Sequence, residues 1–215
     1  MIADTIGGKA AGLARLQELG LPVPPHVVVP VGGELDDPRE VVRVLGEPLA
    51  VRSSAVGEDS RERSAAGQYE TVLGVRGEQL PDAIAHVRSS TERARAYGGS
   101  GDVAVVVQRE VPSTKAGVAF SRDPVTGEDA IVVECAFGSG ERVVSGEVSP
   151  DSYRVAAGRV RARASGDVRT LRDDEVLQVA ELVRRAEAGF GHPVDVEFCF
   201  EGRELWLLQC RAITA

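Results

Sequence analysis

Four polar residues near the end of the chain have the types and the spacing of a magnesium and phosphate site. Asp195 and Glu197 alternate with apolar residues in one segment, and Gln209 and Arg211 alternate with apolar residues in the next. Alternation with a period of two is typical of a half-buried strand, so each pair is expected on one face. Carboxylates are hard oxygen ligands for Mg²⁺, and a guanidinium binds phosphate oxygens through two parallel donors.

The two segments predict a β-hairpin, and the apolar pattern predicts its register. A common core face is expected for the residues Val194, Val196, Phe198, Phe200, Trp206, Leu208 and Cys210. This face requires an odd number of residues in the turn around Gly202, and it places Glu197 opposite Gln209 and Asp195 opposite Arg211. The alternative is an ordinary amphipathic hairpin with cross-strand ion pairs.

The composition limits the class of protein. The chain has 215 residues and a net charge of −8, from 33 acidic and 25 basic residues. This charge argues against general nucleic-acid binding, which needs a basic surface. The three cysteines lie in apolar segments without C-x-x-C spacing, which favours buried free thiols in a reducing compartment. No targeting or membrane segment begins the chain, so we expect a cytoplasmic protein that binds neither nucleic acid nor membrane.

Lysine is rare in this chain, which draws attention to Lys9. Only Lys9 and Lys115 are lysines, and all other basic residues are arginine. Lys9 follows Gly7 and Gly8 at the start of a helix-like segment, although the P-loop spacing is absent. Glycines allow a ligand to approach the backbone, and helix N-termini attract phosphate. The alternative is a solvated lysine at a helix start.

Three further sites carry polar groups that suit a nucleotide. Arg52 stands where an apolar segment from Leu49 passes into hydroxyl residues, so it can hold a phosphate. Gly67 and Gln68 end a stretch of small residues that can fold over phosphates as a flap. Gln108 ends an apolar strand and can offer its amide to an adenine edge. The alternatives are a surface arginine, an ordinary loop and a residue at a sheet margin.

Helices and strands are expected to mix without regular βαβ alternation, which favours an α+β class over a parallel doubly wound fold. The expected helices are 9–19, 38–45, 79–97 and 173–189. The last of these is expected to be N-capped near Asp173 or at Thr170. Besides the terminal hairpin, the expected strands are 26–31, 49–52, 69–75, 103–111, 117–121, 131–136, 152–156 and 159–164.

Taken in order, these motifs resemble the nucleotide-binding domain of the family of phosphoenolpyruvate synthase, pyruvate phosphate dikinase and rifampicin phosphotransferase. The matching segments span nearly the whole chain: Gly7 to Lys9, Gly20 to Pro25, Val51 to Ala55, Ala66 to Thr71, Val107 to Arg109, Ala116 to Gly127, Gly138 to Glu141, Pro150 to Tyr153, Val194 to Glu197, and Leu208 to Arg211.

The resemblance implies an ATP-grasp fold, with antiparallel and mixed sheets, flanking helices and two lobes that clasp MgATP. We expect a trimmed first lobe over 1–100, since the span from Gly8 to Arg52 is shorter than in most relatives, and a second lobe over 101–215. The resemblance implies that Lys9 and Arg52 contact the triphosphate and that Gly67 and Gln68 cover it. It implies that the adenine is lined by Gln108, Arg109, Glu110 and Val111. In the second lobe it implies metal ligation by Glu197 and Gln209 and support of the phosphates by Asp195 and Arg211.

The phosphoryl acceptor stays open in the sequence. The resemblance implies cleavage of ATP to AMP with one phosphate left on a histidine, in a T-x-H-x-A setting of a further domain. His26, His86 and His192 lack that setting, so we interpret them as structural or solvent-facing. The chain stops at Ala215, and we therefore expect a stand-alone phosphotransferase that uses a histidine on a separate carrier protein. The alternatives are a kinase acting directly on a small molecule and a non-catalytic ATP-binding regulatory module.

Overall fold

The structure is a computed structural model that describes residues 3–55, 71–96, 103–138 and 148–213. It contains two compact units: Met1–Ala14 with Pro24–Glu110, and Arg15–Val23 with Val111–Ala215. This division differs from the expected one at residues 100 and 101. Strand β4 (Val103–Arg109) hydrogen-bonds to strands of the first unit, and Leu16 and Leu21 belong to the core of the second.

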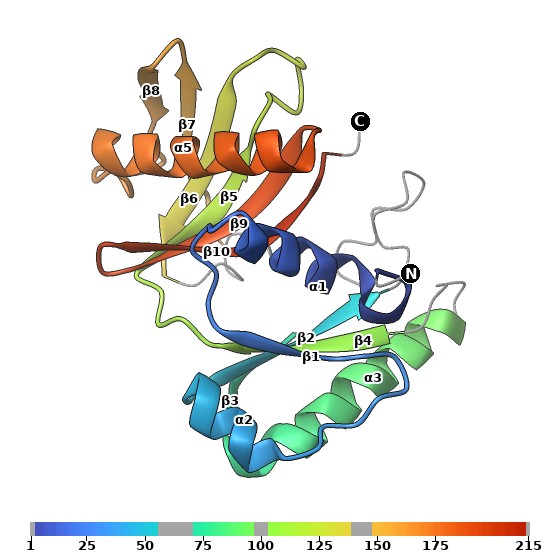
Figure 1. Cartoon of the computed structure of the whole chain (residues 1–215). Helices are drawn as coiled ribbons and strands as arrows, with labels where there is room; N and C mark the ends of the chain where they lie inside the picture. The colour runs from blue at the N-terminus through green and yellow to red at the C-terminus, as the bar shows by residue number, and fades with distance from the viewer. Residues whose placement is uncertain (1–2, 56–70, 97–102, 139–147, 214–215) are drawn as a thin grey trace. The chain divides into compact units, whose positions relative to one another are not determined.

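The first unit is built on a four-stranded antiparallel sheet with the order β1-β4-β2-β3. The other strands are β1 (His26–Val29), β2 (Leu49–Ala55) and β3 (Thr71–Val75). Helices α2 (Pro38–Leu45) and α3 (Leu80–Ala96) cover one face, with the short helix η1 (Gly77–Gln79) before α3 (Figure 1). Leu49, Val51, Val105 and Val107 point into this core, so the residues that alternate with them lie on the opposite face.

The first helix lies over that opposite face of the sheet. Helix α1 spans Ala3–Glu18, but Gly7 interrupts it with a φ of 73°. The Ala10 amide donates to Ser54 Oγ at 3.0 Å, and Ser54 Oγ donates to the Ile6 carbonyl at 2.7 Å. A Cβ at Gly7 would lie 2.3 Å from the Ser54 carbonyl oxygen, so only glycine fits this approach.

The second unit is built on a six-stranded antiparallel sheet with the order β10-β9-β5-β6-β7-β8. Its strands are β5 (Lys115–Phe120), β6 (Ile131–Phe137), β7 (Asp151–Ala156), β8 (Arg159–Arg163), β9 (Val194–Glu201) and β10 (Glu204–Ala212). Helix α5 (Asp173–Phe190) covers one face (Figure 1). Its apolar residues Val176, Val179 and Val183 are fully buried in a core with residues of the sheet, among them Tyr153 and Phe198.

The N-terminus of α5 is held to the sheet by a buried ion pair. Lys115 Nζ donates to both oxygens of Glu175, at 2.7 and 2.8 Å. Burial opposes ionisation of Glu175, but its bonds from Lys115 and the Arg172 amide outweigh this and lower its pKa. The N-cap is Arg172 and neither Asp173 nor Thr170, because the Glu175 side chain itself satisfies the Arg172 amide.

The terminal hairpin has the predicted pairing at one end and a different one near its turn. Glu197 lies opposite Gln209 and Asp195 opposite Arg211, as predicted. Glu201 and Glu204 also pair directly, so the turn has two residues, and the register shifts between Leu207 and Gln209.

This bulge changes which apolar residues of β10 face the core. Leu205, Leu207 and Cys210 belong to the core cluster, so the prediction of Trp206 and Leu208 on that face was wrong. The polar face nevertheless has the predicted membership.

The described residues also bear on three expectations drawn from composition. Cys135, Cys199 and Cys210 are free and buried, as expected. His86 and His192 are exposed, and His26 is half-buried with its Nδ1 3.2 Å from the Pro24 carbonyl. Among the helices that the structure describes, none has the length and apolar composition needed to span a membrane.

Candidate functional site

The polar face of the terminal hairpin is built by cross-strand pairing on the side of the sheet away from α5. Arg211 Nε and one terminal nitrogen each lie 2.8 Å from Asp195 Oδ2. Asp195 is only 6% exposed, and burial raises its pKa, an effect that Arg211 partly offsets. The ion pair therefore offsets part of the cost of burying the Asp195 carboxylate, and it holds the guanidinium of Arg211 against β9.

The next pair along the hairpin supplies oxygen atoms. Glu197 and Gln209 are directly opposed, and Gln209 is buried while Glu197 is half-buried. A carboxylate and an amide oxygen are ligands that Mg²⁺ accepts, and Mg²⁺ usually keeps water or phosphate oxygens at its other positions. Within the described ranges no group of three His, Cys, Asp or Glu side chains is placed to hold a metal ion. The donor set thus fits a cation shared with phosphate oxygens better than an all-protein cage.

In the first unit, Arg52 and the start of α1 share one face of the sheet. Arg52 and Ser54 alternate with the core residue Val51 along β2. Ser54 anchors the backbone of Ile6 and Ala10, so Lys9 is held beside the strand that carries Arg52. The Lys9 backbone, the side of β2 that carries Arg52 and the N-terminal end of the helical segment that follows Gly7 therefore share one face, a combination that can attract phosphate.

Gln108 lies on this face as well, one strand away from Arg52. It pairs with Ala50 of β2 and His26 of β1, and it is 2% exposed. Its Nε2 has no hydrogen-bond partner among the described residues. Because a buried amide donor is costly when unsatisfied, this atom points to an acceptor supplied by a ligand.

The residues that follow Gln108 form hydrogen bonds with different segments of the first unit. The Arg109 amide donates to the Pro25 carbonyl at 2.9 Å, and the Glu110 amide donates to Pro48 at 3.0 Å. Glu110 Oε2 accepts from the Gly74 amide at 2.5 Å, so its carboxylate is bound to β3. Strand β4 ends at Arg109, so Glu110 and Val111 lie in the connection that follows and not in the expected strand.

Two of the predicted site residues, Gly67 and Gln68, lie outside the described residues. Within the first unit, the structure brings Lys9, Arg52 and Gln108 to one face. Within the second, it brings together Asp195, Glu197, Gln209 and Arg211.

Ser54 is a positioning residue whose role sequence reasoning missed. The sequence shows it only as one of the hydroxyl residues after Arg52. Its two bonds to α1 join residues 44 and 48 positions apart, which no local pattern reveals. The available signal was its alternation with Arg52, which places both on one face.

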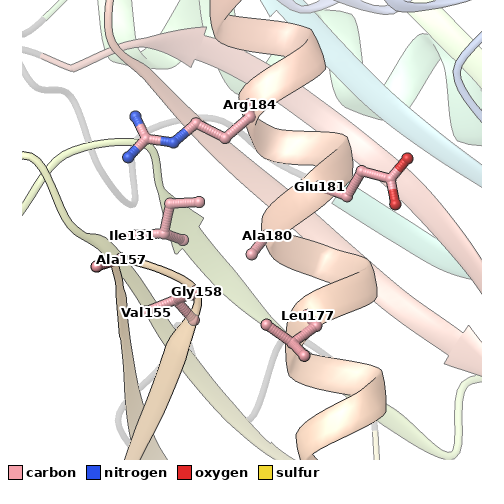
Figure 2. A pocket seen from close by; sticks show the side chains of 8 residues that line it. All are labelled: Ile131, Val155, Ala157, Gly158, Leu177, Ala180, Glu181 and Arg184. Carbon is pink, nitrogen blue, oxygen red and sulfur yellow. The ribbon is translucent and has the colours of Figure 1, made fainter.

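A hollow at the other side of the second sheet contains none of these residues. Figure 2 shows it between α5 and the adjoining ends of β6 and β7, lined mainly by apolar side chains such as Ile131, Val155 and Leu177. Arg184 at its margin is already paired with Asp129 and Glu187. Its chemistry does not suit a triphosphate.

Comparison with known proteins supplies the family. The family model described as "Pyruvate phosphate dikinase, AMP/ATP-binding domain" matches residues 36–165 and 159–215. A probable phosphoenolpyruvate synthase of Methanothermobacter thermautotrophicus is 32% identical, over 97% of this chain and 44% of its own length. A rifampicin phosphotransferase of Streptomyces sp is 35% identical, over 94% of this chain and 27% of its own length. The chain thus spans less than half the length of either relative.

A solved structure with the same fold is the D-alanine–D-alanine ligase from Bacillus anthracis complexed with ATP. It matches with a TM-score of 0.56 at 12% identity, over 96% of this chain and 54% of that one. At this identity the likeness concerns the fold alone, and it agrees with the α+β arrangement of antiparallel sheets and covering helices. The chain has the ATP-grasp fold and belongs to the AMP/ATP-binding domain family of pyruvate phosphate dikinase.

Proposed function

We propose that this chain binds MgATP and catalyses the ATP-dependent step of a dikinase-type phosphotransferase. The observation that carries the proposal is the pairing of Glu197 with Gln209 and of Asp195 with Arg211 on one face. This pairing sets two oxygen donors for a cation beside a fixed guanidinium for phosphate. The names of the relatives, which include phosphotransferases, support the same reaction class.

Each residue has a proposed role in binding and charge neutralisation. Lys9 and Arg52 bind phosphate oxygens, and Gly67 and Gln68 cover them. Gln108 donates its unsatisfied Nε2–H to the base, next to the backbone of Arg109, Glu110 and Val111. Glu197 and Gln209 hold Mg²⁺, while Asp195 orients Arg211 toward the transferring group.

Bound MgATP would supply the phosphoryl group and the main positive charge that balances it. Phosphoryl transfer depends mostly on positioning and on neutralising charge at the phosphoryl oxygens. The contribution of this chain is therefore a fixed set of donors, and none of its side chains needs to form a covalent bond.

The proposed acceptor is a histidine on a carrier protein or carrier domain. The relatives named phosphoenolpyruvate synthase and rifampicin phosphotransferase are longer than this chain, so they have room for further domains. A small molecule that takes the phosphate directly is the second candidate. An ATP-binding module without turnover is the third, and the polar pairs on β9 and β10 favour it least.

The acceptor can be identified with ATP labelled in the β or γ position. The chain is incubated alone, with a histidine carrier domain of a relative, and with candidate small molecules, and the nucleotide products are separated. AMP formed only with the carrier supports the first acceptor, whereas a labelled small molecule supports the second. Tight ATP binding without turnover in any mixture would leave the regulatory module.

The metal assignment has its own test in Glu197→Gln. Loss of a charged oxygen ligand is expected to lower turnover at least 100-fold, with the circular dichroism spectrum unchanged because the residue lies on a half-buried polar face. Glu204→Gln is the matched control, since Glu204 is exposed at the turn end of the same hairpin. Near-normal turnover of Glu197→Gln at limiting Mg²⁺ would rule out this residue as a ligand.

A further inference from the structure

The outward face of the β7–β8 hairpin carries arginines that nucleotide binding does not use. Arg159 and Arg161 occupy alternate positions of β8, and Arg161 lies directly opposite Arg154 of β7. The intervening residues Val155 and Val160 pack in the core beneath α5. The arginines therefore lie on the face away from that helix.

These arginines surround a hollow of about 380 Å³. It is lined by Arg154, Ala156, Ala157, Arg159 and Arg161. The two alanines provide a short apolar wall, and the long side chains provide guanidinium groups around it. The volume and the mixed lining are in the range of small-molecule sites.

The charge of the hollow is not balanced within the described residues. Arg154 is paired with Asp123 and Glu128. The side chains of Arg159 and Arg161, in contrast, form no ion pair or hydrogen bond in the part of the chain that the structure describes. Arg154 thus has its counter-charge from the protein, whereas an anion in the hollow would supply the one that the neighbouring side chains of Arg159 and Arg161 lack.

We propose that this hollow binds a phosphate-bearing small molecule, at a site separate from the proposed nucleotide residues. Arg159 and Arg161 supply the donors, because a guanidinium matches phosphate oxygens with two parallel hydrogen bonds. The carboxylates of Asp123 and Glu128 hold Arg154 in place as the third wall. An arginine-rich edge strand can also serve only to prevent strand pairing between molecules, which requires no ligand.

Inorganic tripolyphosphate is the probe, measured by titration calorimetry on the full chain. Because a polyphosphate also suits the nucleotide site, the chain is first saturated with Mg²⁺ and a non-hydrolysable ATP analogue. Wild-type protein is expected to retain a tripolyphosphate site, and Arg161→Gln is expected to weaken it about tenfold. Arg203→Gln is the matched control, because Arg203 is an exposed arginine in the β9–β10 turn. It should change the affinity less than twofold.

Three results would overturn the proposal. They are an absence of tripolyphosphate binding to the saturated wild type, an equal loss in Arg161→Gln and Arg203→Gln, and binding of an octaglutamate peptide in place of tripolyphosphate. Unchanged circular dichroism and analogue affinity in Arg161→Gln show that folding and the nucleotide site are intact. If the analogue itself does not bind, the comparison of Arg161→Gln with Arg203→Gln still tests the hollow independently.

Discussion

Gln108 is a residue whose effects on stability and on binding should have opposite signs. Its side chain is buried, yet Nε2 lacks a partner in the described part of the chain. An unsatisfied buried donor destabilises a fold by about 1–3 kcal/mol, whereas an apolar side chain of similar shape does not. Gln108 therefore makes the first unit slightly less stable, and it provides a hydrogen-bond donor for a ligand.

The substitution Gln108→Met keeps the length of the side chain and removes the amide. Urea unfolding is expected to show a stability within about 1 kcal/mol of wild type or above it. Calorimetry should show ATP binding weakened by roughly tenfold, which corresponds to one hydrogen bond of about 1.4 kcal/mol. Lower stability together with unchanged ATP affinity would mean that Gln108 is a structural residue.

Asp151 is a second residue with a definable energetic role, here in the fold of the second unit. It accepts from the amides of Ser165 and Thr170 at 2.7 and 2.6 Å, and from the Tyr153 hydroxyl at 3.0 Å. Burial opposes its ionisation, but these hydrogen bonds outweigh it and lower the pKa of Asp151 to about 2. The charged form thus ties β7 to the segment that leads into α5.

This pKa gives a pH-dependent prediction for Asp151→Asn. A carboxyl whose pKa is lower in the folded state stabilises the fold above its unfolded value, and that stabilisation is lost as the pH falls toward 2. The variant is therefore expected to be less stable than wild type by about 2 kcal/mol at pH 6. The difference should shrink between about pH 4 and pH 2 in urea unfolding. Glu204→Gln serves as an exposed control, and a difference that does not vary with pH would contradict the assignment.

At the scale of elements, the first helix depends on a single close approach between backbones. Gly7 has a φ of 73°, and its Cα faces the Ser54 carbonyl. Ser54 in turn fixes the backbone on both sides of Lys9. The position of the lysine is thus determined by a strand more than forty residues away.

Gly7→Ala should disturb this contact, and Gly20→Ala is its control. Both glycines have positive φ, but a Cβ at Gly20 meets nothing within 4 Å. Gly20→Ala is expected to cost about 1 kcal/mol, from backbone conformation alone. Gly7→Ala should cost clearly more and should also weaken ATP binding at least fivefold, because the start of α1 must move. Equal effects of the two changes on ATP affinity would mean that the close contact of Gly7 does not influence nucleotide binding.

The terminal hairpin shows which part of the fold could be predicted from the sequence and which part could not. The pairs of Asp195 with Arg211 and Glu197 with Gln209 were predictable, because each strand alternates strictly at that end. The turn end was not, because Leu205 to Leu208 are all apolar and do not reveal which of them face the core. A two-residue turn and a bulge determine the answer there.

At the scale of the whole molecule, the fold class and the family followed from motif order, but the division of the chain did not. The expected boundary lay between residues 100 and 101. The actual units depend on β4 pairing with both β1 and β2, which are contacts distant in sequence. For the same reason, Arg15–Val23 belongs to the second unit, although it lies in sequence between two segments of the first unit.

The chain therefore passes between its two units at three places, after Ala14, Val23 and Glu110. The nucleotide-binding residues proposed in the first unit lie close to these places, since Lys9 lies shortly before the first and Gln108 shortly before the last.

The bulge in the terminal hairpin has a consequence for how this protein can vary. It divides the hairpin into two registers, so the strand pairing near the turn differs from the pairing at the polar end. The pairs of Glu197 with Gln209 and of Asp195 with Arg211 lie beyond the bulge, so a change of turn length near Gly202 leaves them in place. A register that continued unbroken from the two-residue turn would instead place Leu208 opposite Glu197 and turn Gln209 and Arg211 toward the apolar core. The bulge at Leu208 is thus what allows a two-residue turn and the polar pairs to occur in one hairpin.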